Sequence, residues 1–127
     1  MTTVANADDR NHVHGKGVQE GLAPLARDLR RAIPDVYKAF SELHSAALAP
    51  GVIDAKTKEL IALAVAVSTQ CDGCIASHAK GAARLGATEA EVAEMLGVVI
   101  LMIGGPGTVY GPRALASFRS FAPAETD

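Results

Sequence analysis

The chain has 127 residues, a length that fits one domain and leaves no room for a second of ordinary size. Hydrophobic residues make up 49% of it, aromatic residues only 4%, and tryptophan is absent, so the core must be built mainly from Ala, Val, Leu and Ile. Such small side chains suit close contact between helices. The formal net charge of −2 gives no reason to expect nucleic acid or an anionic membrane as a partner.

The N-terminal residues 1–20 are polar and contain no apolar segment typical of an export signal. The longest apolar run, near residues 95–103, is far shorter than the ~20 residues that a membrane span needs. We therefore expect a cytoplasmic protein. Residues 1–20 also lack helical periodicity, and we interpret them as a flexible arm before a single helical domain, residues 21–127. His12 and His14 in this arm are expected to be solvated, because two isolated ligands make a weak metal site.

The first two helices are expected on either side of a proline. Apolar residues recur at helical spacing from Leu22 to Ile33, and Pro34 ends this run because proline disfavours helical geometry in the residue before it. Pro34 can then open a second helix in its first turn. That helix is expected to end at Pro50 and Gly51, a pair typical of turns.

Two further helices have clear end signals. Asp54 is a suitable N-cap for a third helix, residues 54–70. Beyond Glu59 this helix is apolar nearly all round, which indicates burial on several sides. A fourth helix carries both cysteines and is expected to end at Gly86, since glycine is typical of helix C-termini.

The C-terminal part of the chain predicts two more helices. Thr88 begins a capping box for the fifth helix, which becomes wholly apolar at residues 98–103. The glycine-rich residues 104–107 are interpreted as a turn or kink, and a last helix is expected over residues 110–121. Valine-rich stretches lie inside capped helical patterns, so no β-strand is expected. The fold class is therefore all-α, a compact bundle of about five to six helices.

The chemistry of the chain is concentrated around its two cysteines. Cys71 and Cys74 form a C-x-x-C, and His78 follows Cys74 by four residues. On a helix, residues at these spacings share one face. The loop that the two cysteines would close is too small to restrict much chain entropy, so the pair is not a structural staple. Thiols in a chain without an export signal normally stay reduced. We interpret the pair as redox-active or metal-binding.

Three features would favour the reactive thiolate. Cys71 would lie at or near a helix N-terminus, where the helix dipole favours negative charge. His78 could accept a proton from a cysteine, and Glu59 could orient His78 or hold a proton in a buried relay. The second cysteine would then close the disulfide. The dipole favours Cys71 as the attacking sulfur, whereas the four-residue step to His78 favours Cys74, and both assignments stay open.

Two interpretations without redox chemistry are also compatible with these residues. In the first, Cys71, Cys74 and His78 bind a structural zinc ion with Glu59 as the fourth ligand, a set that tetrahedral zinc accepts. In the second, the chain is a non-catalytic helical assembly protein and these side chains only pack. His44, on the second expected helix, is interpreted as a polar-face or core residue outside the site.

The pattern E-x11-C-x-x-C-x-x-x-H followed by Leu-Gly-Ala-Thr resembles the alkylhydroperoxidase D-like (AhpD-like) branch of the carboxymuconolactone decarboxylase family. The likeness extends from about Pro34 to Phe121. It implies an all-α fold, assembly into homotrimers or homohexamers, and a thiol-dependent peroxidase or disulfide reductase that uses no metal or flavin. The implied catalytic residues are those that match the pattern: Glu59, Cys71, Cys74 and His78.

The resemblance predicts an enzyme that reduces alkyl hydroperoxides through a Cys71–Cys74 disulfide, with no other cofactor. A thiol or dithiol, such as a lipoyl or thioredoxin-like protein, would supply electrons. The alternative within enzymes is a general protein disulfide reductase or thiol carrier. The decarboxylase branch generally lacks the cysteine pair, which argues against decarboxylation. One residue differs: Gly73 stands where alkylhydroperoxidase D has a histidine between its cysteines.

The sequence also predicts self-association. The third expected helix past Glu59 and the fifth past Met95 are apolar on almost every side, and a domain of this length cannot fully enclose two such helices. Soluble monomers rarely expose an apolar patch of several hundred Å². We therefore expect a homo-oligomer, which the family resemblance makes a trimer or a hexamer.

Overall fold

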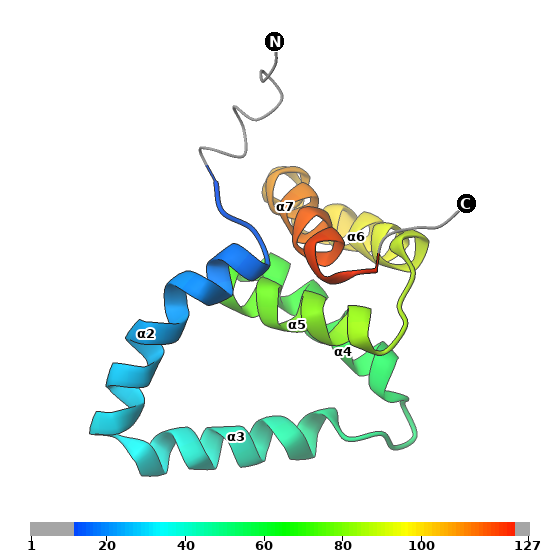
Figure 1. Ribbon diagram of the computed structural model, residues 1–127. Coiled ribbons are helices and arrows are strands. Elements are labelled where there is room, and N and C mark those ends of the chain that lie inside the picture. The colour runs from blue at the N-terminus through cyan, green and yellow to red at the C-terminus, as the bar shows by residue number, and fades with distance from the viewer. Residues whose placement is uncertain (1–11, 124–127) are drawn as a thin grey trace.

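The computed structural model describes residues 12–123, and this part of the chain is helical without any β-strand (Figure 1). The all-α prediction is confirmed. No helix in the described range is both long enough and apolar enough to cross a membrane. The six helices, labelled as in Figure 1, are α2 (Lys16–Ala32), α3 (Pro34–Leu48), α4 (Ala55–Ser68), α5 (Asp72–Arg84), α6 (Glu89–Ile103) and α7 (Gly105–Phe121).

Helices α4 to α7 form the bundle that holds the hydrophobic core, and α5 packs against both α4 and α7. Three alanines of α5, Ala76, Ala79 and Ala82, are completely buried. Side chains this small let neighbouring helices approach closely, as the composition predicts. The largest fully buried side chains fill the space between the helices, and they are Leu63, Val67, Ile75, Val92 and Phe118.

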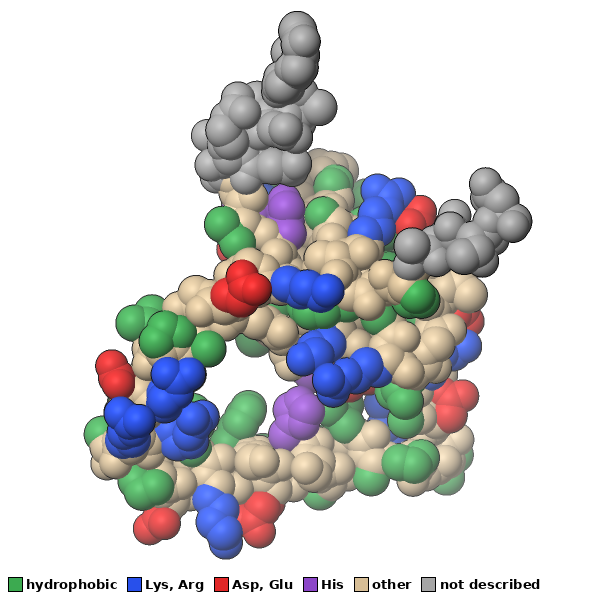
Figure 2. Space-filling model, viewed as in Figure 1, with side chains coloured by type: hydrophobic (Ala, Val, Ile, Leu, Met, Phe, Trp, Pro, Cys, Tyr) green, Lys and Arg blue, Asp and Glu red, His purple; other side chains and the backbone are tan. Residues whose placement is uncertain are grey.

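Helices α2 and α3 form an arm that leaves the bundle and returns to it (Figure 1). Neither helix has a buried residue. Figure 2 shows an opening between the arm and the bundle that side chains do not fill. The arm exposes an apolar series that we call the arm stripe: Leu22, Leu25, Leu29, Ile33, Val36, Phe40 and Leu43.

The predicted helix ends are confirmed where local hydrogen bonds form them. The Asp54 carboxylate accepts the Thr57 N–H at 2.7 Å and caps α4. The Thr88 hydroxyl accepts the Glu91 N–H while the Glu91 carboxylate accepts the Thr88 N–H, which completes the capping box of α6. Gly86 follows α5 with a φ of 84°, a left-handed conformation that favours glycine. These ends depend on residues within one turn, so the sequence predicts them.

The structure corrects the boundary of the N-terminal arm predicted over residues 1–20. Helix α2 begins at Lys16, so the last residues of that segment are helical, while residues 1–11 lie outside the described range. The reason is a tertiary contact: the Gly15 N–H donates to the Ser117 hydroxyl of α7 at 3.0 Å. His12 and His14 are partly buried rather than solvated.

The glycine-rich segment before the last helix is also corrected. Helix α7 begins at Gly105 rather than at residue 110. Gly104 takes a left-handed φ of 71° and ends α6, so the chain reverses within one residue. Pro106 then lies in the first turn of α7, where its missing N–H leaves no hydrogen bond unmade. The segment is thus a one-residue turn followed by a helix start.

Two helix-start carboxylates predict how stability responds to acid. A hydrogen bond from Thr57 lowers the pKa of Asp54 below 3.8, and the Thr88 N–H lowers the pKa of Glu91 below 4.5. Because each pKa is lower in the folded state, the stabilisation is complete above the usual value and is lost as the pH falls through the lowered one. The urea midpoint should therefore be level at mildly acidic pH and decline below about 4.5. Glu91→Gln should show a shallower decline, and an unchanged acid profile would contradict the assignment.

Candidate active site

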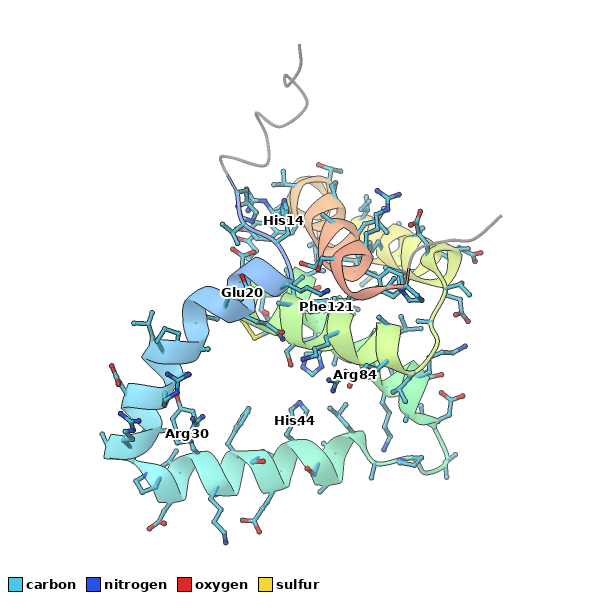
Figure 3. All side chains as sticks on the ribbon, in the orientation of Figure 1. His14, Glu20, Arg30, His44, Arg84 and Phe121 are labelled. Carbon is cyan, nitrogen blue, oxygen red and sulfur yellow. A yellow bond between two sulfur atoms is a disulfide. The ribbon has the colours of Figure 1, made fainter. Side chains whose placement is uncertain are left out.

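The two cysteines lie at the start of α5 and are joined by a disulfide bond, visible as a yellow bond in Figure 3. Cys71 is the N-cap of the helix, and its Sγ accepts the Cys74 N–H at 3.2 Å. A sulfur at this position lies at the positive end of the helix dipole, which stabilises a thiolate in the reduced protein. Cys71 is partly buried, whereas Cys74 is exposed.

His78 lies one turn after Cys74 on α5 and is paired with Glu59 of α4. The His78 Nδ1 and the Glu59 Oε1 are 2.7 Å apart, and the side chains are only 18% and 12% exposed. An ionised carboxylate can only accept, so the proton of this hydrogen bond is on Nδ1. Glu59 therefore selects the tautomer in which Nε2 is free to accept a proton from another group.

Gly81, one turn after His78 on α5, leaves the space that the Glu59 carboxylate occupies. A Cβ atom at this position would overlap that carboxylate. Any larger residue would push Glu59 away from His78, so their hydrogen bond depends on glycine here. In the sequence, the only indication of this contact was a glycine in the middle of an alanine-rich helix.

A small opening beside the cysteines gives access to the site. Its volume is about 340 Å³, and both Cys74 and His78 line it. The other lining residues are Ala62, Val65, Ala66 and Thr69. The wall that α4 contributes is thus mainly apolar, while the reactive sulfur and the imidazole supply the polar groups. This arrangement suits a small molecule with one polar, reactive end and an apolar remainder.

The arm also reaches the site, through two residues that the sequence analysis did not place there. The ring of His44 on α3 stacks on that of His78, with centroids 5.7 Å apart and planes inclined by 16°. Leu22 of α2 packs over Gly73, where a Cβ atom would lie 3.0 Å from its Cδ1. His44 carried no sequence signal beyond its residue type, because the contact joins helices far apart in the chain.

Of the four residues predicted for the site, Glu59 lies on α4, Cys71 and Cys74 lie at the start of α5, and His78 lies one turn further along α5. The structure pairs Glu59 with His78 and Cys71 with Cys74, and it places Cys74 and His78 at one opening. Within residues 12–123, no three His, Cys, Asp or Glu side chains are grouped so that they could hold a metal ion.

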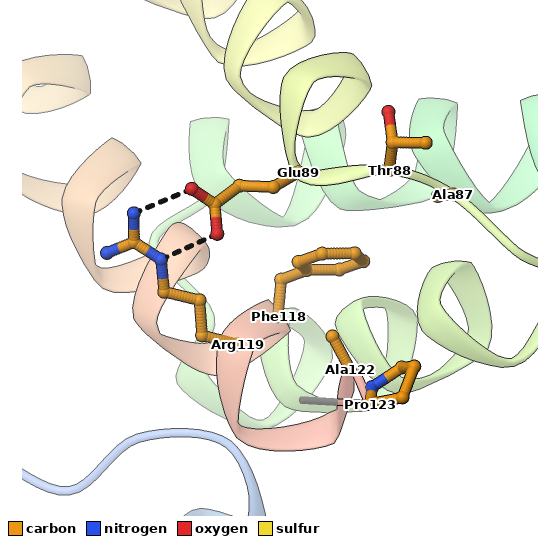
Figure 4. A pocket seen from close by; sticks show the side chains of 7 residues that line it. All are labelled: Ala87, Thr88, Glu89, Phe118, Arg119, Ala122 and Pro123. Carbon is orange, nitrogen blue, oxygen red and sulfur yellow. Dashed lines mark hydrogen bonds and ion pairs between the residues drawn. The ribbon is translucent and has the colours of Figure 1, made fainter. Parts of the chain in front are cut away.

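A larger depression, about 500 Å³, lies between α6 and α7 and contains none of these four residues (Figure 4). Glu89 accepts two hydrogen bonds from the Arg119 guanidinium there, both at 2.8 Å. This bidentate pair lowers the pKa of Glu89 and joins the two helices. It contributes to packing and offers no nucleophile.

The sequence matches the model of the carboxymuconolactone decarboxylase family over residues 34–117. The chain belongs to this family. The matched range begins with α3 and ends in α7, so it includes the cysteines, the Glu59–His78 pair and His44. The family contains enzymes of more than one activity, so membership alone leaves the reaction open.

The chain is also similar to proteins of known sequence or structure, one of which carries the same family name. The chain is 43% identical over 90 residues to an uncharacterized protein of Cupriavidus necator, covering 71% of this chain and 80% of that protein. The crystal structure of an apo carboxymuconolactone decarboxylase family protein from Legionella pneumophila matches with a TM-score of 0.79 and 39% identity, covering 84% of this chain and 95% of that one. A crystal structure from Thermotoga maritima matches with a TM-score of 0.65 and 30% identity, covering 74% and 88%.

The space at Gly81 provides a test of the Glu59–His78 pair. Gly81→Ala should displace the Glu59 carboxylate, so that reduced Cys74 reacts at least about tenfold more slowly with iodoacetamide at neutral pH. Glu59→Gln should give the same loss. Gly21→Ala is the control, because a Cβ atom at that helical position meets no atom within 4 Å. Equal reactivity of Gly81→Ala and Gly21→Ala would show that the pair does not act on the thiol.

Proposed function

We propose that this protein is a thiol oxidoreductase of the alkylhydroperoxidase D-like branch that reduces alkyl hydroperoxides through a Cys71–Cys74 cycle. The observation that carries the proposal is the placement of a C-x-x-C disulfide one helical turn from a buried Glu59–His78 pair, at a mainly apolar opening. A redox pair, a positioned base and an apolar wall are the parts that this reaction needs.

The geometry favours Cys74 as the attacking residue and Cys71 as the resolving one. Cys74 is exposed and lines the opening together with His78, whereas Cys71 is partly buried. In the reduced protein, the free Nε2 of His78 accepts the Cys74 proton, and the imidazolium is stabilised by Glu59. The C-x-x-C spacing keeps Cys71 within reach of the Cys74 sulfur for the second step.

The cycle then balances as a two-electron reduction. The Cys74 thiolate attacks the terminal oxygen of the hydroperoxide and the O–O bond breaks. The leaving alkoxide takes the proton from His78 and departs as an alcohol, which leaves a sulfenic acid on Cys74. Cys71 attacks that sulfur and releases water, forming the disulfide. An external dithiol, such as that of a lipoyl or thioredoxin-like protein, reduces it again.

Gly73, between the two cysteines, affects which groups can transfer protons at the site, because it lies against α2. Leu22 packs over it, and even a Cβ atom would meet that side chain at 3.0 Å. A histidine between the cysteines would therefore require the Leu22 side chain to shift. We infer that this protein relies on Glu59 and His78 for proton transfer, with no imidazole between the two cysteines.

A second candidate function is general disulfide reduction or thiol transfer. The observation that favours it is the exposure of Cys74, which would let a protein disulfide reach the sulfur. Decarboxylation, known elsewhere in the family, is disfavoured by the cysteine pair at the site. Either thiol cycle needs a supply of reduced dithiols, which the cytoplasm provides.

Thiol trapping with mass spectrometry of the intact protein tests the proposal. The dithiol-reduced protein should react with cumene hydroperoxide to give one intramolecular disulfide, reversible by dithiols. Cys71→Ser should stop at a sulfenic acid on Cys74 that dimedone traps, and Cys74→Ser should not react. Native spectra provide the zinc control: a stoichiometric zinc ion that protects both thiols would refute the redox cycle. Reaction with a protein disulfide but not with the hydroperoxide would favour the second candidate.

We also propose that copies of the chain assemble through apolar surfaces that a single copy leaves uncovered. Helix α6 exposes Val98, Leu101 and Met102 at 60%, 78% and 74%. An apolar groove of about 330 Å³ lies between α4 and α6 beside these residues. The arm stripe is exposed as well. The groove of one copy would therefore pack against the arm stripe of another copy, and both apolar surfaces would be buried. A trimer or a hexamer, as in the similar family branch, would bury both.

Sedimentation equilibrium tests the assembly. A trimer or hexamer should persist at micromolar concentration in dilute and in salt-rich buffer, since ions do not screen apolar burial. Leu101→Lys should shift the equilibrium towards smaller species. Val52→Lys is the matched control, because Val52 is fully exposed in the loop before α4. A parent protein that stays monomeric in both buffers would contradict the proposal.

A further inference from the structure

His44 is a contact of the α2–α3 arm with the candidate active site that the proposed reaction has not used. Figure 3 shows its side chain pointing from α3 towards α5. Its ring lies nearly parallel to the ring of His78, with planes inclined by 16° and centroids 5.7 Å apart. The large apolar side chains of the arm stripe are exposed. The stacking of His44 on His78 is therefore not part of an apolar contact between the arm and the bundle.

The position of His44 is fixed by a second contact beside the site. Lys58 of α4 donates hydrogen bonds to the carbonyl oxygens of Ala47 and Ala49, at 3.1 and 2.6 Å. These carbonyls lie at the C-terminal end of α3, where helix carbonyls lack partners within the helix. Lys58 precedes Glu59 directly, and His44 lies about one turn before the anchored carbonyls. Lys58, the neighbour of Glu59, therefore also holds the end of α3 that carries His44.

We propose that His44 is a positioning residue for His78. Glu59 holds the Nδ1 edge of the His78 ring, but one hydrogen bond leaves the ring free to tilt about its bond to Cβ. The His44 ring, stacked beside the His78 ring, would limit that tilt and shield part of that face from water. Nε2 is thereby held towards the opening that Cys74 lines. The inference rests on the proposed function, because it concerns the base of that reaction.

The role proposed for His44 needs no charge on its ring. Glu59 of α4 and His44 of α3 are the titratable groups whose contacts with His78 the structure gives. When His78 takes the Cys74 proton, Glu59 compensates its charge, whereas a cationic His44 on its face would oppose it. A flat uncharged ring at position 44 should therefore serve as well as histidine, and this separates positioning from proton transfer by His44.

The experiment compares His44→Ala, His44→Phe and the exposed control Ser45→Ala in the full chain. Disulfide formation with cumene hydroperoxide is followed across the pH range. Stacked aromatic pairs contribute amounts that correspond to about two- to tenfold in rate, so His44→Ala should slow oxidation by about that factor. Its pH profile should move to higher pH, because water reaches the uncovered imidazolium. His44→Phe should recover the parent rate to within about twofold, and Ser45→Ala should match the parent.

Two results would overturn the proposal: a His44→Ala protein with the parent's rate and pH profile, or a His44→Phe protein as slow as His44→Ala. Circular dichroism of each variant shows whether α3 remains helical. Lys58→Met provides a second variant, which removes the two anchoring hydrogen bonds and should slow oxidation in the same direction as His44→Ala.

Failure of the proposed peroxidase function would be seen separately. The NMR signals of ¹³C-labelled His78 report its titration without any peroxide. If no protein in the set reacts with cumene hydroperoxide, the peroxidase proposal fails, while a changed His78 titration in His44→Ala that His44→Phe lessens would still support the positioning role. An identical titration in the parent and His44→Ala would refute that role whatever the reaction is.

Discussion

The hydrogen bond between Glu59 and His78 is the interaction on which the site depends. Both side chains are largely removed from water, and a largely buried carboxylate needs a hydrogen-bond partner. The pair also joins α4 to α5, so helix packing and proton chemistry rely on the same contact. Gly81 makes it possible by leaving room for the carboxylate. A substitution that disturbs the packing of α4 on α5 would therefore also disturb the His78 imidazole at the opening that Cys74 lines.

Helices α2 and α3 leave many apolar side chains exposed in a single copy of this chain. Helices α2 and α3 have no buried residue, yet their apolar positions recur at helical spacing, as in a helix that packs against a neighbour. The bundle in turn exposes Val98, Leu101 and Met102 on α6. The arm is tied at both ends, by Gly15 to α7 and by the α3 C-terminus to Lys58. Leu22 and His44 are the side chains through which the arm contacts residues of the site.

The two corrected boundaries show where local patterns mislead. Residues 16–20 are polar, and nothing within one turn of them indicates a helix, but the contact of Gly15 with Ser117 directs the chain into α2 from 102 residues away. The residues after Gly104 are rich in glycine and were expected to form a turn. They begin α7 because one left-handed glycine suffices to reverse the chain and Pro106 suits a first helical turn.

The sequence by itself determined the all-α class, the caps at Asp54 and Thr88, and the placement of Cys74 and His78 one turn apart on a helix. These properties depend on residues within one or two helical turns, where spacing alone decides which side chains meet. The tertiary structure alone decided that Glu59 holds Nδ1 of His78, that Gly81 makes room for it, and that the His44 ring stacks on that of His78. Each of these contacts joins different helices, and the angle and distance between two helices follow from the packing of the whole bundle.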